Sequence, residues 1–108
     1  MPDLVYRPAA LADLDAIYDH IAADNPRRAF AYVQDIRERC RLLETHPRLG
    51  PAREDLGIGV RIYTTLQRVM VAYRISENSI SIVRVFYGER DYAALMRAQD
   101  DAEPSDTA

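Results

Sequence analysis

The sequence predicts an α+β domain with the element order β-α-α-β-β-β, in which a helical hairpin packs on one face of a mostly antiparallel four-stranded sheet. Three observations support this fold class. The chain has 108 residues, which is the usual size of one domain. Two apolar stripes with three- and four-residue spacing meet at Asn25-Pro26. Three strand-like runs then follow one another between residues 60 and 87.

The two helices are predicted on either side of Asn25-Pro26. A residue before proline is pushed out of the α region, so a first helix from about residue 9 should stop by Asp24. Asparagine is a good N-cap and proline is favoured at the first helical position, so a second helix should run from Pro26 to about Glu44. The short connection makes the pair an antiparallel hairpin. The stripes comprise Leu11, Leu14, Ile17, Tyr18 and Ile21, then Ala29, Val33, Ile36, Cys40 and Leu43.

The predicted sheet combines one early strand with three late ones. The last strand is apolar on both faces, which is typical of a central strand. The turn at Glu77-Asn78 has good turn chemistry, whereas the turn at Leu66-Gln67 has poor turn chemistry. The expected strands are residues 4–7, 60–65, 68–76 and 79–87, with a loop over residues 45–59.

The C-terminal end is expected to differ from the rest. Residues 91–98 are the candidate for a short final helix. The last nine residues carry four acids and few apolar side chains. We therefore expect a folded domain over residues 1–98 and an acidic, disordered tail over residues 99–108.

The composition limits which cellular compartment and which classes of partner the protein can have. No apolar run approaches the roughly 18 residues of a membrane helix, and the N-terminus has no charged region followed by an apolar one. The single cysteine, Cys40, cannot form an internal disulfide, so we expect a cytoplasmic protein without a membrane partner. All 14 basic residues are arginine, and residues 48–97 hold eight of them against five acids. That excess permits nucleic-acid contact, but we expect no sequence-specific DNA binding.

Motifs for cofactor and metal chemistry are missing from the sequence. It has no glycine-rich phosphate loop, no HExxH and no paired Cys/His spacing. His20 and His46 are the only histidines, too few for a nucleophile–histidine constellation, and we expect both to have structural or surface roles. Cys40 lies on an apolar stripe and is expected in the core. We therefore expect neither a cofactor nor a metal.

The segment over residues 83–92, VRVFYGERDY, is the strongest candidate for a functional site. It carries Arg84, Tyr87 and Arg90, which we expect to lie with Arg61 near one edge of the sheet. Arginines beside aromatic rings can bind a protein surface, or a phosphate backbone with stacked bases. The alternative interpretation is a strand end with a solvated charge cluster.

Two ordered patterns resemble those of a known family. The loop between the second helix and the sheet contains Pro47, Gly50, Arg53, Asp55 and Leu56 at the spacing P-x-x-G-x-x-R-x-D-L. The closing strand runs into R-V-F-Y-G-E-R-D at residues 84–91. Over residues 4–95 the chain resembles ParE-type toxins of the ParE/RelE superfamily. It departs from their pattern at Tyr87, where the family commonly has histidine.

The resemblance implies the toxin component of a type II toxin–antitoxin system, a class linked to bacterial stress responses. Such a toxin is neutralised by direct binding of a cognate antitoxin, here expected to be ParD-like with a ribbon-helix-helix domain, in a hetero-oligomer. The expected action is inhibition of DNA gyrase, and hence of replication, without intrinsic catalysis. The alternatives are a RelE-like ribosome-dependent mRNA endonuclease and a diverged, non-toxic binding module. The absence of lysine and of a C-terminal histidine favours the gyrase interpretation over the endonuclease.

Site residues follow from this interpretation. The target would contact the late arginines and their neighbours, and the endonuclease alternative would use Arg61, Arg84, Tyr87 and Arg90 for catalysis. The antitoxin would cover apolar residues of the first helix. The expected target-binding residues are Arg61, Arg84, Tyr87, Arg90 and Asp91, and the expected antitoxin-binding residues are Leu14, Ile17, Tyr18 and Ile21.

Overall fold

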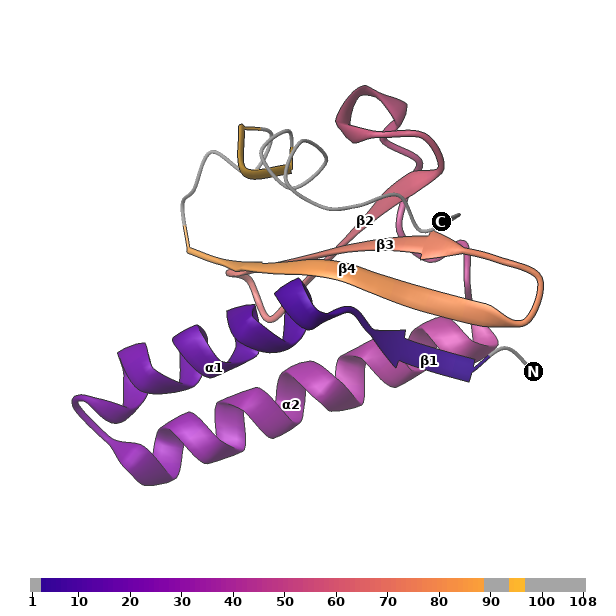
Figure 1. Cartoon of the computed structure of the whole chain (residues 1–108). Coiled ribbons are helices and arrows are strands. Elements are labelled where there is room, and N and C mark those ends of the chain that lie inside the picture. Colours follow the sequence, from indigo (N-terminus) through magenta and orange to yellow (C-terminus); the bar gives the residue numbers. More distant parts are fainter. Residues whose placement is uncertain (1–2, 89–93, 97–108) are drawn as a thin grey trace.

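A computed structural model of the chain describes residues 3–88 and 94–96 (Figure 1). It confirms the α+β class and the predicted order of helices and strands. Of the predicted final helix, residues 94–96 are helical and the remainder lies outside the described residues, as does the acidic segment 99–108. The elements are β1 (Asp3–Tyr6), α1 (Pro8–Ala22), α2 (Pro26–Thr45), the 3-10 helix η1 (Glu54–Leu56), β2 (Val60–Thr65), β3 (Val69–Ile75) and β4 (Ser79–Tyr87).

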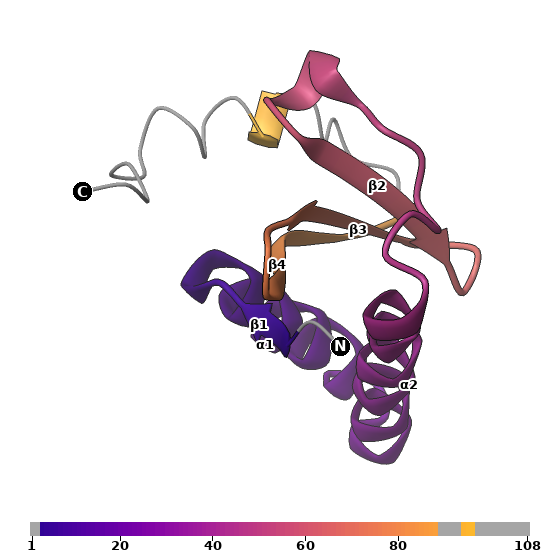
Figure 2. The ribbon, with the colours of Figure 1, turned by 90° about the vertical axis from the view of Figure 1, so that its right-hand side faces the viewer.

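The helical hairpin forms where the sequence predicts it. Asn25 has extended backbone angles, and its Oδ1 accepts a hydrogen bond from the Arg28 amide at 3.1 Å. Pro26 occupies the first turn of α2, where its missing N–H costs nothing. Both helices lie on the same side of the sheet (Figure 2). None of the described helices is long and apolar enough to cross a membrane.

The sheet has the strand order β1-β4-β3-β2, so β4 is central, as its two apolar faces predict. β1 pairs with β4 in parallel, and the other two pairs are antiparallel. The β3–β4 register shifts by one residue between Ala72 and Tyr73, which pair with Arg84 and Ile82, so Val83 is the extra residue of a bulge.

The two faces of the sheet support separate apolar clusters. The helix-facing cluster joins the hairpin stripes to β3 and β4 and includes Leu14, Ile36, Cys40 and Tyr73. The opposite cluster is smaller, and η1 and residues 94–96 cover it (Figure 2). Its buried members are Leu56, Val60, Ile62, Ala72, Val83, Phe86 and Met96.

The β2–β3 turn forms despite its unfavourable residues. Leu66 and Gln67 both adopt positive φ, at 52° and 67°. Thr65 pairs with Val69, so the loop between the strands has three residues, and two of them are left-handed. A left-handed backbone costs free energy for residues other than glycine, asparagine or aspartate. The turn therefore stores local strain, a feature that often occurs near functional sites.

Candidate functional site

Tyr87, at the end of β4, lies in a cluster of aromatic and basic side chains from four parts of the fold. Its ring centroid is 5.6 Å from that of Tyr32 on α2, in an edge-on arrangement, and 5.9 Å from that of His20 on α1. The guanidinium carbon of Arg68, which follows the strained turn, lies 5.9 Å from the same ring. We call His20, Tyr32, Arg68 and Tyr87 the Tyr87 cluster.

The β-sheet register fixes two members of this cluster against each other. Val69 pairs with Tyr87, and the Gly88 amide donates a hydrogen bond to the Arg68 carbonyl at 2.8 Å. The preceding residue, Arg68, is therefore held beside the Tyr87 ring. A guanidinium near an aromatic ring is attracted to its π face, which stabilises this arrangement further.

Two adjoining cavities open at the Tyr87 cluster and share His20 and Tyr87. The smaller, about 40 Å³, extends toward Asp13 and Ile17. The larger, about 170 Å³, extends past Asn25 and Arg28 at the start of α2. The site therefore offers rings, hydroxyls and guanidinium groups to a partner, and the residues that the structure describes contain no group of side chains suited to hold a metal ion.

The surroundings of Tyr32 disfavour the ionised form of its hydroxyl. Burial and the neighbouring Tyr87 raise the pKa of Tyr32, while Arg68 and Arg28 act in the opposite direction without cancelling the effect. The hydroxyl is therefore a hydrogen-bonding group at physiological pH rather than a base.

Arg84 is occupied by an ion pair inside the fold. Its Nε and Nη2 donate to the two carboxylate oxygens of Asp13 at 2.7 and 2.8 Å, and both side chains are only 15% exposed. Asp13 Oδ2 also accepts the Val85 amide at 2.8 Å. β1 pairs with β4 only as far as Ile82, and beyond it no strand among the described residues pairs with that edge of β4. The Asp13 carboxylate caps part of this edge.

Arg61 is likewise engaged in holding the loop before β2. Its Nη1 donates to the Gly50 carbonyl at 2.7 Å. Its neighbour Tyr73 accepts the Gly50 amide at 2.9 Å and donates to the Pro47 carbonyl at 2.7 Å. Arg61 shares the helix-facing side with Tyr73, whereas Arg84 packs over Phe86 of the opposite cluster, so the structure does not bring the two arginines together.

The other predicted site residues divide into three groups. Leu14 and Ile17 are 2% and 5% exposed and belong to the core. Tyr18 and Ile21 keep partly exposed side chains on α1, so an antitoxin contact there stays a prediction. The last two candidates, Arg90 and Asp91, lie outside the described residues.

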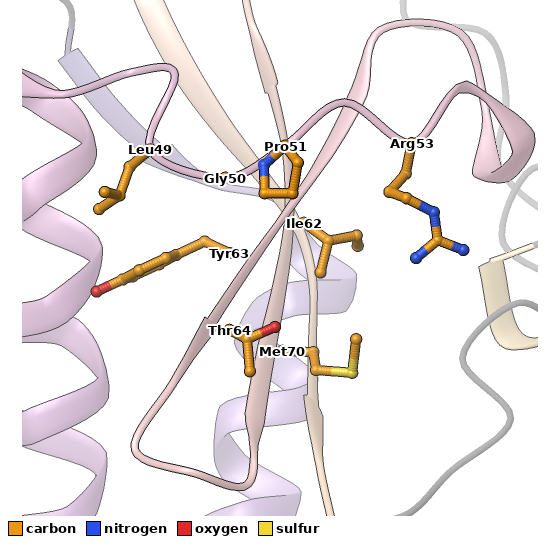
Figure 3. Close-up of a pocket in the computed structure, with 8 residues that line it drawn as sticks. All are labelled: Leu49, Gly50, Pro51, Arg53, Ile62, Tyr63, Thr64 and Met70. Atoms are coloured by element: carbon orange, nitrogen blue, oxygen red, sulfur yellow. The ribbon is translucent and has the colours of Figure 1, made fainter.

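The loop that precedes β2 covers part of the outer edge of that strand. Ala52 forms an antiparallel bridge to Arg61, and the Ile62 amide donates to the Pro51 carbonyl at 3.1 Å. A side chain at Gly50 would place Cβ 2.6 Å from the Ile62 carbonyl oxygen, so only glycine fits the crossing. Figure 3 shows the cavity of about 420 Å³ beside this crossing, which is lined by Leu49, Gly50, Pro51, Arg53, Ile62, Tyr63, Thr64 and Met70.

Sequence reasoning missed three members of the Tyr87 cluster: His20, Tyr32 and Arg68. A usable signal was present for Arg68. In a regular hairpin that turns at Glu77-Asn78, residue 68 would lie directly opposite residue 87. The bulge at Val83 moves this pairing by only one residue, so that Val69 pairs with Tyr87. His20 and Tyr32 reach the cluster through helix packing, for which no local pattern exists.

Comparisons with known proteins agree with this architecture. The family model described as ParE toxin of type II toxin–antitoxin system, parDE, matches residues 4–92. A solved structure, "Chromosomal ParDE TA system from P. aeruginosa", contains a chain with 34% sequence identity and a TM-score of 0.71. The match covers 82% of this chain and 98% of that chain. The comparison with curated proteins gives no match.

Proposed function

This chain belongs to the ParE family, the toxins of type II toxin–antitoxin systems, and on that basis we propose that it inhibits DNA gyrase and is neutralised by direct binding of a cognate antitoxin. The matching family is described as the toxin of a toxin–antitoxin system, and the similar P. aeruginosa chain belongs to a ParDE system. An antitoxin partner is therefore the natural counterpart of this toxin.

The partner is proposed to be a ParD-like antitoxin with a ribbon-helix-helix domain, assembled with the toxin in a hetero-oligomer. The name parDE in the family description supports this type. On the toxin, the partly exposed Tyr18 and Ile21 of α1 are the proposed contact residues. Leu14 and Ile17 would act indirectly, by supporting that helix from the core.

The observation that carries the gyrase proposal is the placement of the arginines. Cleavage of RNA requires groups that activate the 2′-hydroxyl, stabilise the phosphorane and protonate the leaving oxygen. Arg61 and Arg84 are bound to Gly50 and Asp13 and lie on different faces of the sheet. The accessible functional groups are instead those of the Tyr87 cluster, whose rings and Arg68 guanidinium suit a protein surface.

The test is inhibition of purified gyrase by Tyr87 variants. Tyr87→Phe should leave inhibition nearly unchanged, because the ring supplies the contact area. Tyr87→Ala should weaken inhibition by at least about tenfold, as expected for the loss of an aromatic interface anchor. Phe30→Ala is the matched control, since it removes a ring that is 60% exposed on α2 outside the cluster.

Two outcomes would contradict the proposal. One is a Tyr87→Ala variant that is stably folded and still inhibits gyrase fully. The other is codon-specific cleavage of ribosome-bound mRNA that Tyr87→Phe abolishes, because a lost hydroxyl would then point to proton transfer and to the endonuclease alternative.

A further inference from the structure

Arg28 and Arg68 approach the Tyr87 ring from different elements of the fold. The guanidinium carbon of Arg68 lies 5.9 Å from the centroid of the ring. Arg28 lines the larger of the two cavities at the cluster, of about 170 Å³, together with Tyr87 and His20. Both arginines are exposed, and within the described residues neither has a carboxylate within ion-pair distance. Both charges are therefore available to a ligand.

The hydroxyl of Tyr32 lies within electrostatic reach of both guanidinium groups. Arg28 and Tyr32 are one helical turn apart on α2, so their side chains share one face of the helix. Burial is the main influence on the pKa of Tyr32 and raises it, whereas Arg68 and Arg28 lower it. The two guanidinium groups and the hydroxyl are all hydrogen-bond donors, and a carboxylate can accept from several donors at once.

The backbone of Arg68 is held at both of its polar groups. Its amide donates to the Leu66 carbonyl and its carbonyl accepts the Gly88 amide, both at 2.8 Å. The two residues before it, Leu66 and Gln67, have the positive φ angles of the strained turn. A guanidinium whose backbone is already fixed loses less conformational freedom when it binds a ligand, so the turn contributes to the affinity of the site.

The acidic side chains near the cluster do not occupy this position. Asp13 lines the smaller cavity, but its carboxylate is already bound by Arg84. Asp24 lines the larger cavity, is exposed and has no ion pair within the described residues. The effect of Asp35 on the pKa of Tyr32 is weaker than that of either arginine. The charged groups nearest the Tyr32 hydroxyl therefore favour an anionic ligand.

We propose that the Tyr87 cluster and Arg28 together bind a carboxylate side chain on the surface of the target protein. The carboxylate accepts hydrogen bonds from the two guanidinium groups and from the Tyr32 hydroxyl, and the carbon chain that carries it packs against the Tyr87 ring. The occupant rests on the proposed function, in which the target is gyrase. A basic residue at the same place on the target would be rejected by the two arginines.

The probe is benzoate, which joins a carboxylate to a ring, and benzamide is its uncharged counterpart of the same shape. Each is titrated into the full chain at constant ionic strength, and the amide shifts of His20, Arg68 and Gly88 are followed by NMR. Benzoate should bind at least about tenfold more tightly than benzamide, because only benzoate accepts charge-assisted hydrogen bonds from the arginines.

Charge variants connect this site to the target. The double variant R28E/R68E should lose the preference for benzoate, and the concentration of the chain that half-inhibits gyrase should rise by at least about tenfold. Arg27→Glu is the matched control, since Arg27 is exposed in the same turn of α2 and lines neither cavity. It should change both quantities less than about twofold. Circular dichroism spectra of the variants should match that of the unchanged chain, because all three arginines are exposed.

The carboxylate site is ruled out if benzamide binds as tightly as benzoate, or if R28E/R68E keeps the preference for benzoate. The occupant is wrong if this variant loses that preference but inhibits gyrase as strongly as the unchanged chain. A chain that binds benzoate through the two arginines but does not inhibit gyrase would contradict the proposed function and leave the carboxylate site standing.

Discussion

Two buried tyrosine hydroxyls in this protein have opposite surroundings. Tyr73 Oη accepts the Gly50 amide and donates to the Pro47 carbonyl, so it connects β3 to the loop before β2. Tyr6 Oη is buried and has no hydrogen-bond partner within bonding distance among the described residues, and its polar neighbour is the Cys40 thiol, which interacts only weakly. Burial raises the pKa of both side chains, so both hydroxyls are protonated at physiological pH and affect stability only through hydrogen bonding.

Replacing each of the two tyrosines by phenylalanine tests this difference in hydrogen bonding directly. Tyr73→Phe should lower the free energy of unfolding by about 1–3 kcal/mol, because the Gly50 amide would be left buried without a partner. Tyr6→Phe should leave it unchanged or raise it by up to about 1 kcal/mol, because an unpaired hydroxyl is removed. Urea denaturation followed by circular dichroism measures both. Equal losses in the two variants would contradict this assignment of hydrogen bonds.

Single residues also show where sequence reasoning ends. The pattern of residues 83–92 drew attention to Tyr87, whose ring contacts that of Tyr32 in the Tyr87 cluster. The same pattern could not reveal that Arg84 pairs with Asp13, which is 71 residues away in the chain. An arginine next to an aromatic residue looks the same in sequence whether it binds a partner or its own fold.

Among the contacts between elements, the ion pair between α1 and β4 is central. The Asp13 carboxylate binds both the Arg84 guanidinium and the Val85 amide, at a point where none of the described strands pairs with β4 on that side. It therefore fixes α1 against the end of the strand that carries Tyr87. Tyr87 and His20, which face each other across this junction, depend on that contact for their positions.

Asp13→Asn should lower the free energy of unfolding by about 2–4 kcal/mol, since it leaves a largely buried guanidinium without its counter-charge. Asp15→Asn on the same helix is the matched control, because Asp15 is exposed, and it should change stability by less than about 0.5 kcal/mol. Thermal and urea unfolding of both variants provide the measurement. Similar values for the two would show that the Asp13 pair contributes little.

Elements with local signals were predictable, and those without were not. The hairpin break at Asn25-Pro26 follows from capping and from the backbone limits of proline. The Leu66-Gln67 turn lies where the sequence predicts it, but its positive φ angles have no local signal, because the paired strands on either side impose them. The bulge at Val83 likewise depends on tertiary packing rather than on a residue with a special backbone preference.

The whole molecule has a helix-covered face, a second face with a smaller apolar cluster, and two different sheet edges. The fold class was predictable because the helical and strand periods are well separated along the chain. The Tyr87 cluster was not, because it forms only when α1, α2 and the β2–β3 turn meet the end of β4. The site is therefore a property of the assembled fold.

Gyrase inhibition by the whole protein is best tested by the conversion of relaxed plasmid DNA to the supercoiled form by purified gyrase. The chain should block the reaction, and prior addition of its cognate antitoxin should restore it. The mRNA in a parallel ribosome-dependent translation reaction should stay intact. Unimpaired supercoiling at micromolar toxin, together with cleaved mRNA in the translation reaction, would contradict the gyrase proposal.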